Sequence, residues 1–448
     1  MSEKSIAQLM AHRTLDPGDG AVVDVDEFLP LRALLGRAVR KARLLRQAGV
    51  GRGTHVALAA GSWTATAVDY LACAWLGAVA VLSDDERLLA TVGSPVVRLG
   101  QGDEPPHRIR PGPGPRPGPD DPLDVIFSSG TTGVPKPTVS RHGDWDFRPW
   151  RPAGRPADRV VHCGVPFGTS TGVHGILLRH LSAGVVSVAA RSVAEVPELA
   201  DRHGCREIVL TPYSLRKLLD RGDHPFARIK TVKVLAGPVH GGLASAAVEA
   251  FPNARIFSIY GATELGPAIF TRLVDLGEST ALGSPSPGTA ARVVDAGRRV
   301  CAPGEVGEIE VSHRANGVSA PAPDWIGTGD LGYVDELGCV FLIGRAKEIL
   351  MLPSGRTTPG DVEERLLEVP SVRDCGVVAI DSTGEWDRLG ACIVVEHPAK
   401  TAEVRAALAS FDPAIAKIAF VSSIPRTALG KPIRSRMWHM LTAAGAQG

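Results

Sequence analysis

A stretch of small, hydroxyl-bearing residues ends in a lysine and directly follows the apolar run Val125-Ile126-Phe127. It reads Ser128-Ser129-Gly130-Thr131-Thr132-Gly133-Val134-Pro135-Lys136. A buried strand over the apolar run would bring the glycines to its carboxyl end, where backbone N–H groups can face an anion, and Lys136 would add a mobile positive charge. The Gly-Lys-Ser/Thr ending of a Walker loop is missing. By itself the stretch fits either a polyphosphate-binding loop or a surface turn.

Four further motifs follow down the chain. In order they are Tyr260-Gly261-Ala262-Thr263-Glu264, Gly327-Thr328-Gly329-Asp330, Gly344-Arg345-Ala346-Lys347-Glu348 and Pro425-Arg426-Thr427-Ala428-Leu429-Gly430-Lys431. Together with the lysine loop, these motifs and their order resemble the adenylate-forming superfamily of acyl-CoA synthetases, peptide-synthetase adenylation domains and luciferases. The resemblance extends from about Ala33 to Arg434 and indicates an unusually compact member.

Charge and composition limit the kinds of partner. The 49 basic and 48 acidic side chains of the 448 residues nearly cancel, so we expect a small metabolite rather than a nucleic acid or a membrane surface. The seven cysteines lack CxxC pairs, which disfavours disulfides or structural zinc and fits a reducing compartment. No apolar run follows the first charges, and Gly61, Ser62 and Asp69 interrupt the apolar stretch 56–82. We therefore expect a cytoplasmic protein, and its Arg/Ala/Gly/Pro-rich composition suggests specialised metabolism in a high-GC bacterium.

Helix-like and strand-like segments alternate along the chain. Residues 33–47 have helical spacing and precede an apolar strand candidate at 56–59, and the alternation resumes between Val161 and Val234. This pattern predicts an α/β fold of layered subdomains, whereas the Pro/Gly-rich run 111–122 predicts a surface linker. By resemblance, residues 1–346 form a large adenylate-forming domain that holds ATP and the acid. Residues 347–448 then form a small, mobile α+β lid with Lys347 as the hinge.

The reaction that the resemblance implies joins two anions. A carboxylate attacks the α-phosphorus of ATP, giving an acyl-adenylate and pyrophosphate, so positive charge and oriented dipoles must lie where negative charge accumulates. The resemblance places the β- and γ-phosphates on the loop 128–136, with Lys136 neutralising them. It places the α-phosphate at Thr263 and a magnesium ion at Glu264, because this hard cation prefers oxygen. His142 stands where the family carries a His after this loop.

The resemblance also assigns the remaining contacts to ATP. They are Gly237 and Pro238 at the adenine, Tyr260 and Gly261 at the border of the adenine and the acyl pocket, and Asp330 and Arg345 at the ribose hydroxyls. Lys431 is the expected key catalytic residue, entering from the small domain to bridge the carboxylate and α-phosphate oxygens. Each side chain alone fits an ordinary turn or salt bridge, so the functional interpretation depends on their conjunction.

The acid pocket is expected around Phe167, His174 and Gly261. Amino-acid-activating relatives usually carry an Asp after the corresponding Phe, where it pairs with the substrate ammonium, and many acyl-CoA synthetases carry a His. Here that position is Gly168, which disfavours an α-amino acid and favours an aromatic or short acyl carboxylic acid. His174 is close enough to line the pocket, although a lone His is more often structural.

Three interpretations of the second step remain open. The favoured one transfers the acyl group to the thiol of CoA or of a phosphopantetheine-bearing acyl carrier protein. The second uses a non-thiol acceptor, an amine as in amide synthetases or nitrite as in diazo formation. It is motivated by Pro137 in place of the usual Gly and by an altered loop 350–355, which in relatives contacts pantetheine. The third is a non-catalytic nucleotide-binding protein, which the intact set Lys136, Glu264, Asp330, Arg345 and Lys431 disfavours.

Overall fold

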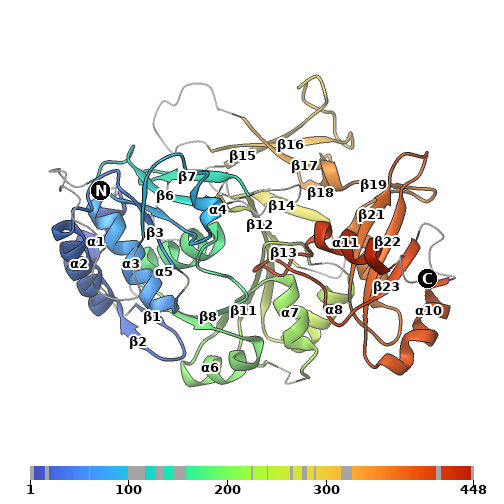
Figure 1. Ribbon diagram of the computed structural model, residues 1–448, viewed down its shortest axis with the longest axis horizontal. Helices are drawn as coiled ribbons and strands as arrows, with labels where there is room; N and C mark the ends of the chain where they lie inside the picture. The colour runs from blue at the N-terminus through green and yellow to red at the C-terminus, as the bar shows by residue number, and fades with distance from the viewer. Residues whose placement is uncertain are drawn as a thin grey trace. The chain divides into compact units, whose positions relative to one another are not determined.

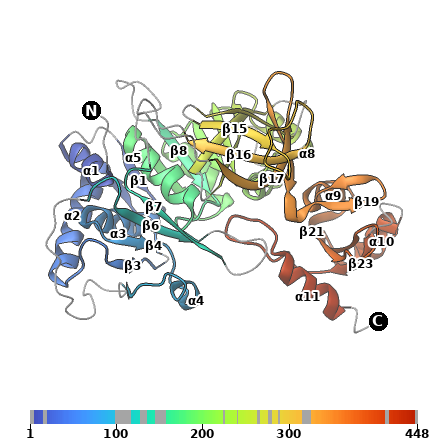
Figure 2. The ribbon, with the colours of Figure 1, turned by 90° about the horizontal axis from the view of Figure 1, so that it is seen from above.

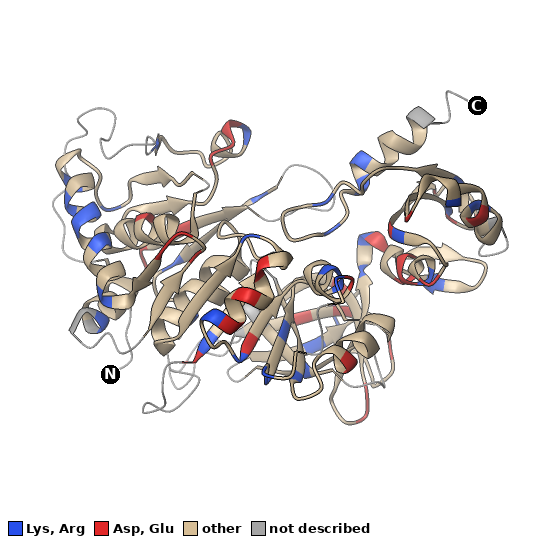
Figure 3. Ribbon diagram, turned by 90° about the horizontal axis from the view of Figure 1, so that it is seen from below, with Lys and Arg blue, Asp and Glu red and all other residues tan. Residues whose placement is uncertain are grey.

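The computed structural model describes residues 5–15, 20–59, 61–98, 117–127, 135–144, 158–222, 226–239, 241–262, 266–274, 280–286, 289–313, 325–409 and 415–444. Two compact units divide the chain. The first comprises Met1–Gly237 and Ala247–Ala268, and the second comprises Pro238–Ala246 and Ile269–Gly448. The domain boundary expected at 346/347 falls inside the second unit and stays a prediction. Acidic and basic residues are interspersed in both units (Figure 3), and their total charges nearly cancel.

A parallel sheet runs through the first unit in the order β12-β11-β10-β8-β9-β1, and β2 pairs antiparallel with β1 (Figure 1). Its inner strands are short and almost wholly buried, as in parallel sheets that helices cover on both faces. The strands are β1 (Ala21–Val23), β2 (Phe28–Pro30), β8 (Arg159–Cys163), β9 (Val186–Ala190), β10 (Glu207–Leu210), β11 (Thr231–Leu235) and β12 (Arg255–Ala262).

A second sheet of the first unit has the order β5-β3-β4-β6-β7. Its strands are β3 (His55–Ala57), β4 (Val79–Val81), β5 (Val96–Arg98), β6 (Pro122–Phe127) and β7 (Pro137–Arg141). The strands run parallel except β7, which returns antiparallel beside β6. Pro122, counted above in the linker, is thus the first residue of β6, a position where a missing N–H is tolerated.

Helices α1, α2 and α3 pack against one another in the first unit (Figure 2). The apolar positions of α2 recur three and four residues apart and form one buried stripe. Ser62 caps the start of α3 by accepting from the Ala65 N–H, and Gly77 ends it in a left-handed conformation. The helices up to the unit boundary are α1 (Ile6–Leu15), α2 (Leu31–Gln47), α3 (Trp63–Leu76), α4 (Glu86–Leu89), the π-helix η1 (Thr171–Leu178), α5 (Arg179–Ala183), the 3-10 helix η2 (Val193–Glu195), α6 (Val196–Arg202), α7 (Pro212–Leu219) and α8 (Gly241–Ala250).

The second unit begins with antiparallel strands in the order β15-β16-β17-β18-β14-β13. Their bounds are β13 (Gly266–Leu273), β14 (Ala281–Pro285), β15 (Thr289–Val294), β16 (Gly307–His313), β17 (Ile326–Val334) and β18 (Val340–Arg345). The 3-10 helix η3 (Ala346–Glu348), which contains Lys347, follows β18 directly. At its entrance Gly344 has φ +153°, and a Cβ there would lie 2.6 Å from Cγ2 of Thr358.

The rest of the second unit is built on a small sheet, β21-β22-β23, beside the hairpin β19-β20. Val377, Ala391 and Ile393 pack with α9 and α10, whereas their strand neighbours Val378 and Cys392 pack with α11. Since alternate residues of a strand face opposite sides, α11 covers the face opposite α9 and α10. The elements are β19 (Leu350–Leu352), β20 (Gly355–Thr357), α9 (Pro359–Leu367), β21 (Val372–Asp381), β22 (Arg388–Val395), η4 (Pro398–Lys400), α10 (Thr401–Ala409), β23 (Ile415–Phe420) and α11 (Arg434–Ala444).

Candidate active site

Predicted site residues of the first unit lie at the carboxyl ends of parallel strands. Phe167 follows β8, and Gly237 follows β11. Tyr260 and Gly261 are among the last residues of β12. These strands share one edge because they run parallel in one sheet. The connection that leaves β8 runs to β9, and the one that leaves β10 runs to β11 on the other side. Such a switch of direction is where open α/β sheets bind their ligands.

The backbone at the end of β11 is strained. Ala236 has φ 68°, a left-handed conformation that costs a non-glycine residue roughly 1 kcal/mol or more. The next residue is closely packed, since a Cβ on Gly237 would lie 3.1 Å from Cγ of Pro212. This turn ends the strand abruptly at the carboxyl edge, in the stretch expected to pass along the adenine.

Aromatic side chains surround Phe167. Its ring lies edge-on to Trp63, with 4.9 Å between centroids, and to Tyr70, with 6.0 Å. The following residue, Gly168, is tightly packed, because a Cβ there would lie 3.3 Å from the backbone oxygen of Leu82 just after β4. An Asp or His at position 168 would therefore require a small shift of the neighbouring backbone.

A buried polar network joins the strand before the lysine loop to the segment after Phe167. Asp124 of β6 accepts from the Tyr70 hydroxyl at 2.7 Å, and its Oδ2 lies 2.7 Å from Nε2 of His174 in η1. Nδ1 of His174 lies 3.3 Å from Oγ of Ser170. Burial and the nearby Asp124 carboxylate raise the pKa of Tyr70 well above its usual value, so this hydroxyl remains a donor. Both ring nitrogens of His174 therefore have protein partners. A contact between His174 and a substrate stays a prediction.

His142 lies directly after β7 and is fully buried. Burial lowers its pKa to about 4, against the opposing effect of Asp121 and Asp124. The ring is therefore neutral near pH 7. Within the described ranges neither ring nitrogen has a hydrogen-bond partner.

In the second unit, β17 and β18 hold Asp330 and Arg345 directly opposite each other. Nε of Arg345 lies 3.0 Å from Oδ1 of the buried Asp330, and its Nη1 donates to the Thr328 carbonyl at 2.5 Å. The Thr328 hydroxyl in turn donates to the Ile309 carbonyl. The pair predicted to hold the ribose is thus fixed to the sheet by its neighbours, with Arg345 partly exposed.

Lys431 belongs to the same unit and lies within electrostatic reach of that pair. Desolvation by surrounding protein lowers the pKa of its ammonium, and Arg345 lowers it further, whereas Asp330 and Glu348 raise it. The residue keeps exposed surface, so this desolvation is partial. The structure therefore brings Asp330, Arg345 and Lys431 together, although Lys431 lies at least 86 positions after the other two in the sequence.

The remaining predicted residues are only partly described. Lys136 is exposed just before β7, and Lys347 is exposed in η3. The loop 128–134, Thr263 and Glu264 lie outside the described residues. The magnesium site at Glu264 therefore stays a prediction; among the residues that the structure describes, no group of three or more His, Cys, Asp or Glu could hold a metal.

Sequence reasoning missed Tyr70 and Asp124. Asp124 did carry a signal, because an acidic residue inside the apolar run Leu123–Phe127 needs a buried partner. Tyr70 carried none, since its partner Asp124 lies 54 positions away in the sequence.

Comparison with known proteins identifies the family. The family of AMP-binding enzymes matches residues 83–318, which is more than half of the chain, and its C-terminal domain matches residues 361–431. The chain belongs to the AMP-binding enzyme family. This confirms the resemblance to adenylate-forming enzymes and, at the level of class, the prediction of an AMP-forming ligase.

Curated relatives of this AMP-binding enzyme are ligases. It is 29% identical over 367 residues to the fatty acid–[acyl-carrier-protein] ligase ScoC of Streptomyces coeruleorubidus, covering 71% of this chain and 68% of that protein. It is 27% identical to 4-coumarate–CoA ligase 5 of Oryza sativa subsp. japonica, covering 72% and 66%. The chain thus spans about two thirds of the length of these relatives.

Solved structures share the fold of this AMP-binding enzyme. O-succinylbenzoate coenzyme A synthetase (MenE) from Bacillus subtilis, in complex with ATP and magnesium, has a TM-score of 0.75 at 22% identity and covers 96% of this chain and 98% of that chain. Amide bond synthetase McbA from Marinactinospora thermotolerans has a TM-score of 0.73 at 23% identity, covering 97% and 99%. Both confirm the α/β fold class. Across the described residues, no helix combines the length and the apolarity needed to span a bilayer.

Proposed function

We propose that this AMP-binding enzyme uses ATP to activate a carboxylic acid as an acyl-adenylate, with release of pyrophosphate. The observation that carries the proposal is the position of Lys431 close to the Asp330–Arg345 pair. A cation next to the residues expected at the ribose is suited to stabilise the charge that develops as carboxylate and α-phosphate join.

The available side chains suit a magnesium nucleotide. Asp330 supplies a carboxylate that can accept from both ribose hydroxyls, and Arg345 fixes its orientation. Lys136 and Lys431, both exposed residues, supply ammonium groups whose positive charge suits phosphates. Thr263 at the α-phosphate and Glu264 at magnesium complete the proposed set, together with the loop 128–134. ATP would supply the adenylyl group, with pyrophosphate as the leaving group, and these residues would orient it.

The acid is proposed to be aromatic or short. Trp63, Tyr70 and Phe167 form an aromatic cluster beside the carboxyl edge of the sheet, and rings pack well against such a cluster. Gly168 leaves no carboxylate to pair with the ammonium of an amino acid. Phe167 and Gly261 are therefore proposed to border the acid.

The favoured acceptor is a thiol of CoA or of an acyl carrier protein, in line with the names of the ligase relatives. One observation favours a non-thiol acceptor instead. The altered loop closes as a tight hairpin, with Leu352 opposite Gly355, and the Met351 N–H donates to Asp387 at 2.6 Å. Residues 350–355, which the resemblance places at pantetheine, thus lie in a closed hairpin. The hinge role of Lys347 is proposed with either acceptor.

Pyrophosphate release tests the proposal directly. Purified protein, ATP and magnesium are incubated with a panel of aryl, alkyl and amino acids, each with CoA, with a carrier protein or with neither. Release that depends on an aryl or short acyl acid supports adenylation, and the thioester formed names the acceptor. Acid-dependent release without a thioester directs the search to amines or nitrite. ATP binding without release for any acid would contradict the proposal and favour a non-catalytic nucleotide-binding protein.

A further inference from the structure

The segment that carries Lys431 is a closed turn. The Thr427 N–H donates to the Lys431 carbonyl at 2.8 Å, and the Gly430 N–H donates to the Thr427 carbonyl at 2.8 Å. Gly430 has φ +82°, which favours glycine. A bridge between Arg426 and Pro432 closes the base of the turn. These backbone contacts fix the conformation of residues 426–432, which we call the lysine turn, and with it the backbone of Lys431.

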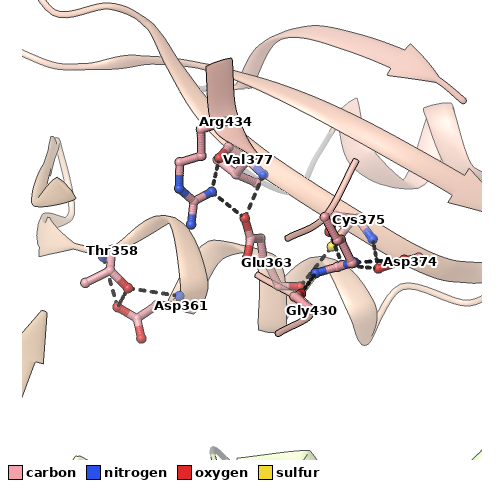
Figure 4. Close-up of polar contacts among 9 residues, drawn as sticks. Thr358, Asp361, Glu363, Asp374, Cys375, Val377, Gly430 and Arg434 are labelled. Carbon is pink, nitrogen blue, oxygen red and sulfur yellow. Dashed lines mark hydrogen bonds and ion pairs between the residues drawn. The ribbon is translucent and has the colours of Figure 1, made fainter. Parts of the chain in front are cut away.

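Arg426 ties the lysine turn to strand β21. Its Nη1 donates to the Gly430 carbonyl at 2.7 Å, next to Lys431. Its Nη2 donates to Oδ1 of Asp374 at 2.5 Å and to the Cys375 carbonyl at 3.2 Å, and its Nε lies 3.4 Å from Oδ2 of Asp374. Figure 4 shows Gly430 beside Asp374 and Cys375. A planar guanidinium can make these bonds at once because its donors have a fixed geometry.

We propose that Arg426, oriented by Asp374, is a positioning residue that holds the lysine turn so that Lys431 reaches the reacting groups. This inference rests on the proposed function. Lysine has a long, flexible side chain, so the protein controls its position mainly through the backbone from which it starts. A displacement of about 1 Å at a reacting group can cost on the order of 10²-fold in rate.

A second ion pair, which contacts the backbone of the same strand, provides a matched control. Nη1 of Arg434 lies 2.7 Å from Oε1 of Glu363, and the same guanidinium donates to the Val377 carbonyl (Figure 4). The side chains of Arg426 and Asp374 are each 15% exposed, and those of Arg434 and Glu363 are 21% and 14% exposed. The two pairs are thus similar in type and burial, but Arg434 anchors the start of α11 to α9 and β21.

The first test is a set of variants assayed for adenylate formation. Arg426→Ala is expected to lower kcat on the order of 10²-fold with little change in the KM for ATP, and Arg426→Lys is expected to recover little, because an ammonium cannot bridge Gly430 and Asp374 together. Asp374→Asn gives a second variant that keeps the side-chain volume. Arg434→Ala is expected to change kcat less than about threefold. Equal kcat losses for Arg426→Ala and Arg434→Ala would overturn the inference.

A double-mutant cycle tests whether Arg426 acts through Lys431. If it does, Arg426→Ala costs nothing further in a Lys431→Ala background. Independent, additive losses would overturn the inference.

A readout without catalysis separates this inference from the proposed function. The rate at which acetic anhydride modifies Lys431 is followed by mass spectrometry in the intact, substrate-free protein, with the exposed Lys417 of β23 as internal reference. Arg426→Ala and Asp374→Asn are expected to change the rate at Lys431 relative to Lys417, and Arg434→Ala is not. An unchanged ratio in all three variants would overturn the inference. If no acid yields an adenylate, the proposed function fails, while this reactivity measurement still decides whether Arg426 positions Lys431.

Discussion

Asp124 and His174 meet in the interior of the first unit, with 2.7 Å between Oδ2 and Nε2 and no exposed surface on either side chain. Asp124 lies in β6, which leads into the lysine loop, and His174 lies in the π-helix after Phe167. The contact therefore ties the segment expected to bind phosphates to the segment expected to bind the acid. A π-helix is rare and is often found at functional sites.

Removing this carboxylate should destabilise the protein strongly. Asp124→Ala leaves the Tyr70 hydroxyl and Nε2 of His174 without their acceptor, and each buried polar group left unpaired costs about 1–3 kcal/mol in the free energy of unfolding. Urea unfolding followed by circular dichroism measures this loss. The matched control is Glu86→Ala, because Glu86 pairs with Arg98 on the surface and its loss should have no measurable effect. Equal stability of both variants would show that the network contributes little.

His142 should make stability depend on pH. Burial lowers its pKa to about 4, whereas the unfolded chain binds the proton near pH 6.5. Between these values the unfolded state holds more protons, so the contribution of His142 to stability is present above about pH 6.5 and is lost as the pH falls towards 4. Relative to His142→Leu, the wild type should thus lose free energy of unfolding across this window. A difference between the two proteins that does not change with pH would refute the assignment.

Two glycines should respond in opposite ways to alanine. A Cβ on Gly172, in η1, would lie 2.1 Å from the Pro166 carbonyl oxygen, so Gly172→Ala must displace η1 or the segment that carries Phe167. Gly36 lies in the middle of α2, where the nearest atom to a Cβ is the flexible end of Arg40 at 3.6 Å. Gly36→Ala should therefore raise the free energy of unfolding by about 0.5–1 kcal/mol, and Gly172→Ala should lower it. Thermal or urea unfolding compares them, and a stabilised Gly172→Ala would contradict the observed packing.

Lys347 should matter more for acyl transfer than for adenylation. A proline at this position of η3 removes a backbone N–H and fixes φ, which restricts the rotation expected of a hinge. Lys347→Pro should therefore slow thioester or amide formation from the adenylate more than it slows adenylate formation, whereas Lys347→Ala should leave both steps nearly unchanged. Single-turnover measurements of each half-reaction separate them. Similar losses in both steps would speak against a hinge at Lys347.

Local patterns in the sequence predicted the elements of the first unit well. The helix expected at 33–47 lies within α2, because apolar spacing reports directly which face of an element is buried. The strand expected at 56–59 overlaps β3, which begins at His55 and already ends at Ala57. The apolar stretch 56–82 is the buried passage from β3 through α3 to β4 rather than a membrane span. The run expected as a linker ends at Asp121, one residue earlier than predicted, since Pro122 begins β6.

The contacts that fix the site were not predictable in the same way. Asp330 and Arg345 were each identified from a motif, but their pairing depends on the register of β17 and β18. Arg426 was part of a recognised motif without a role of its own, because its partner Asp374 lies 52 residues earlier in an ordinary strand. Such pairings arise from topology, which apolar spacing does not encode.

Acid-dependent pyrophosphate release by the wild type and by Lys431→Ala tests the central claim most directly. The wild type should release pyrophosphate with at least one aryl or short acyl acid. Lys431→Ala should bind ATP with similar affinity but lose nearly all of this release, because the charge that develops at the α-phosphate lacks its cation. Undiminished release by Lys431→Ala would contradict the account, since it would remove from the reaction the residue that the fold places beside Asp330 and Arg345.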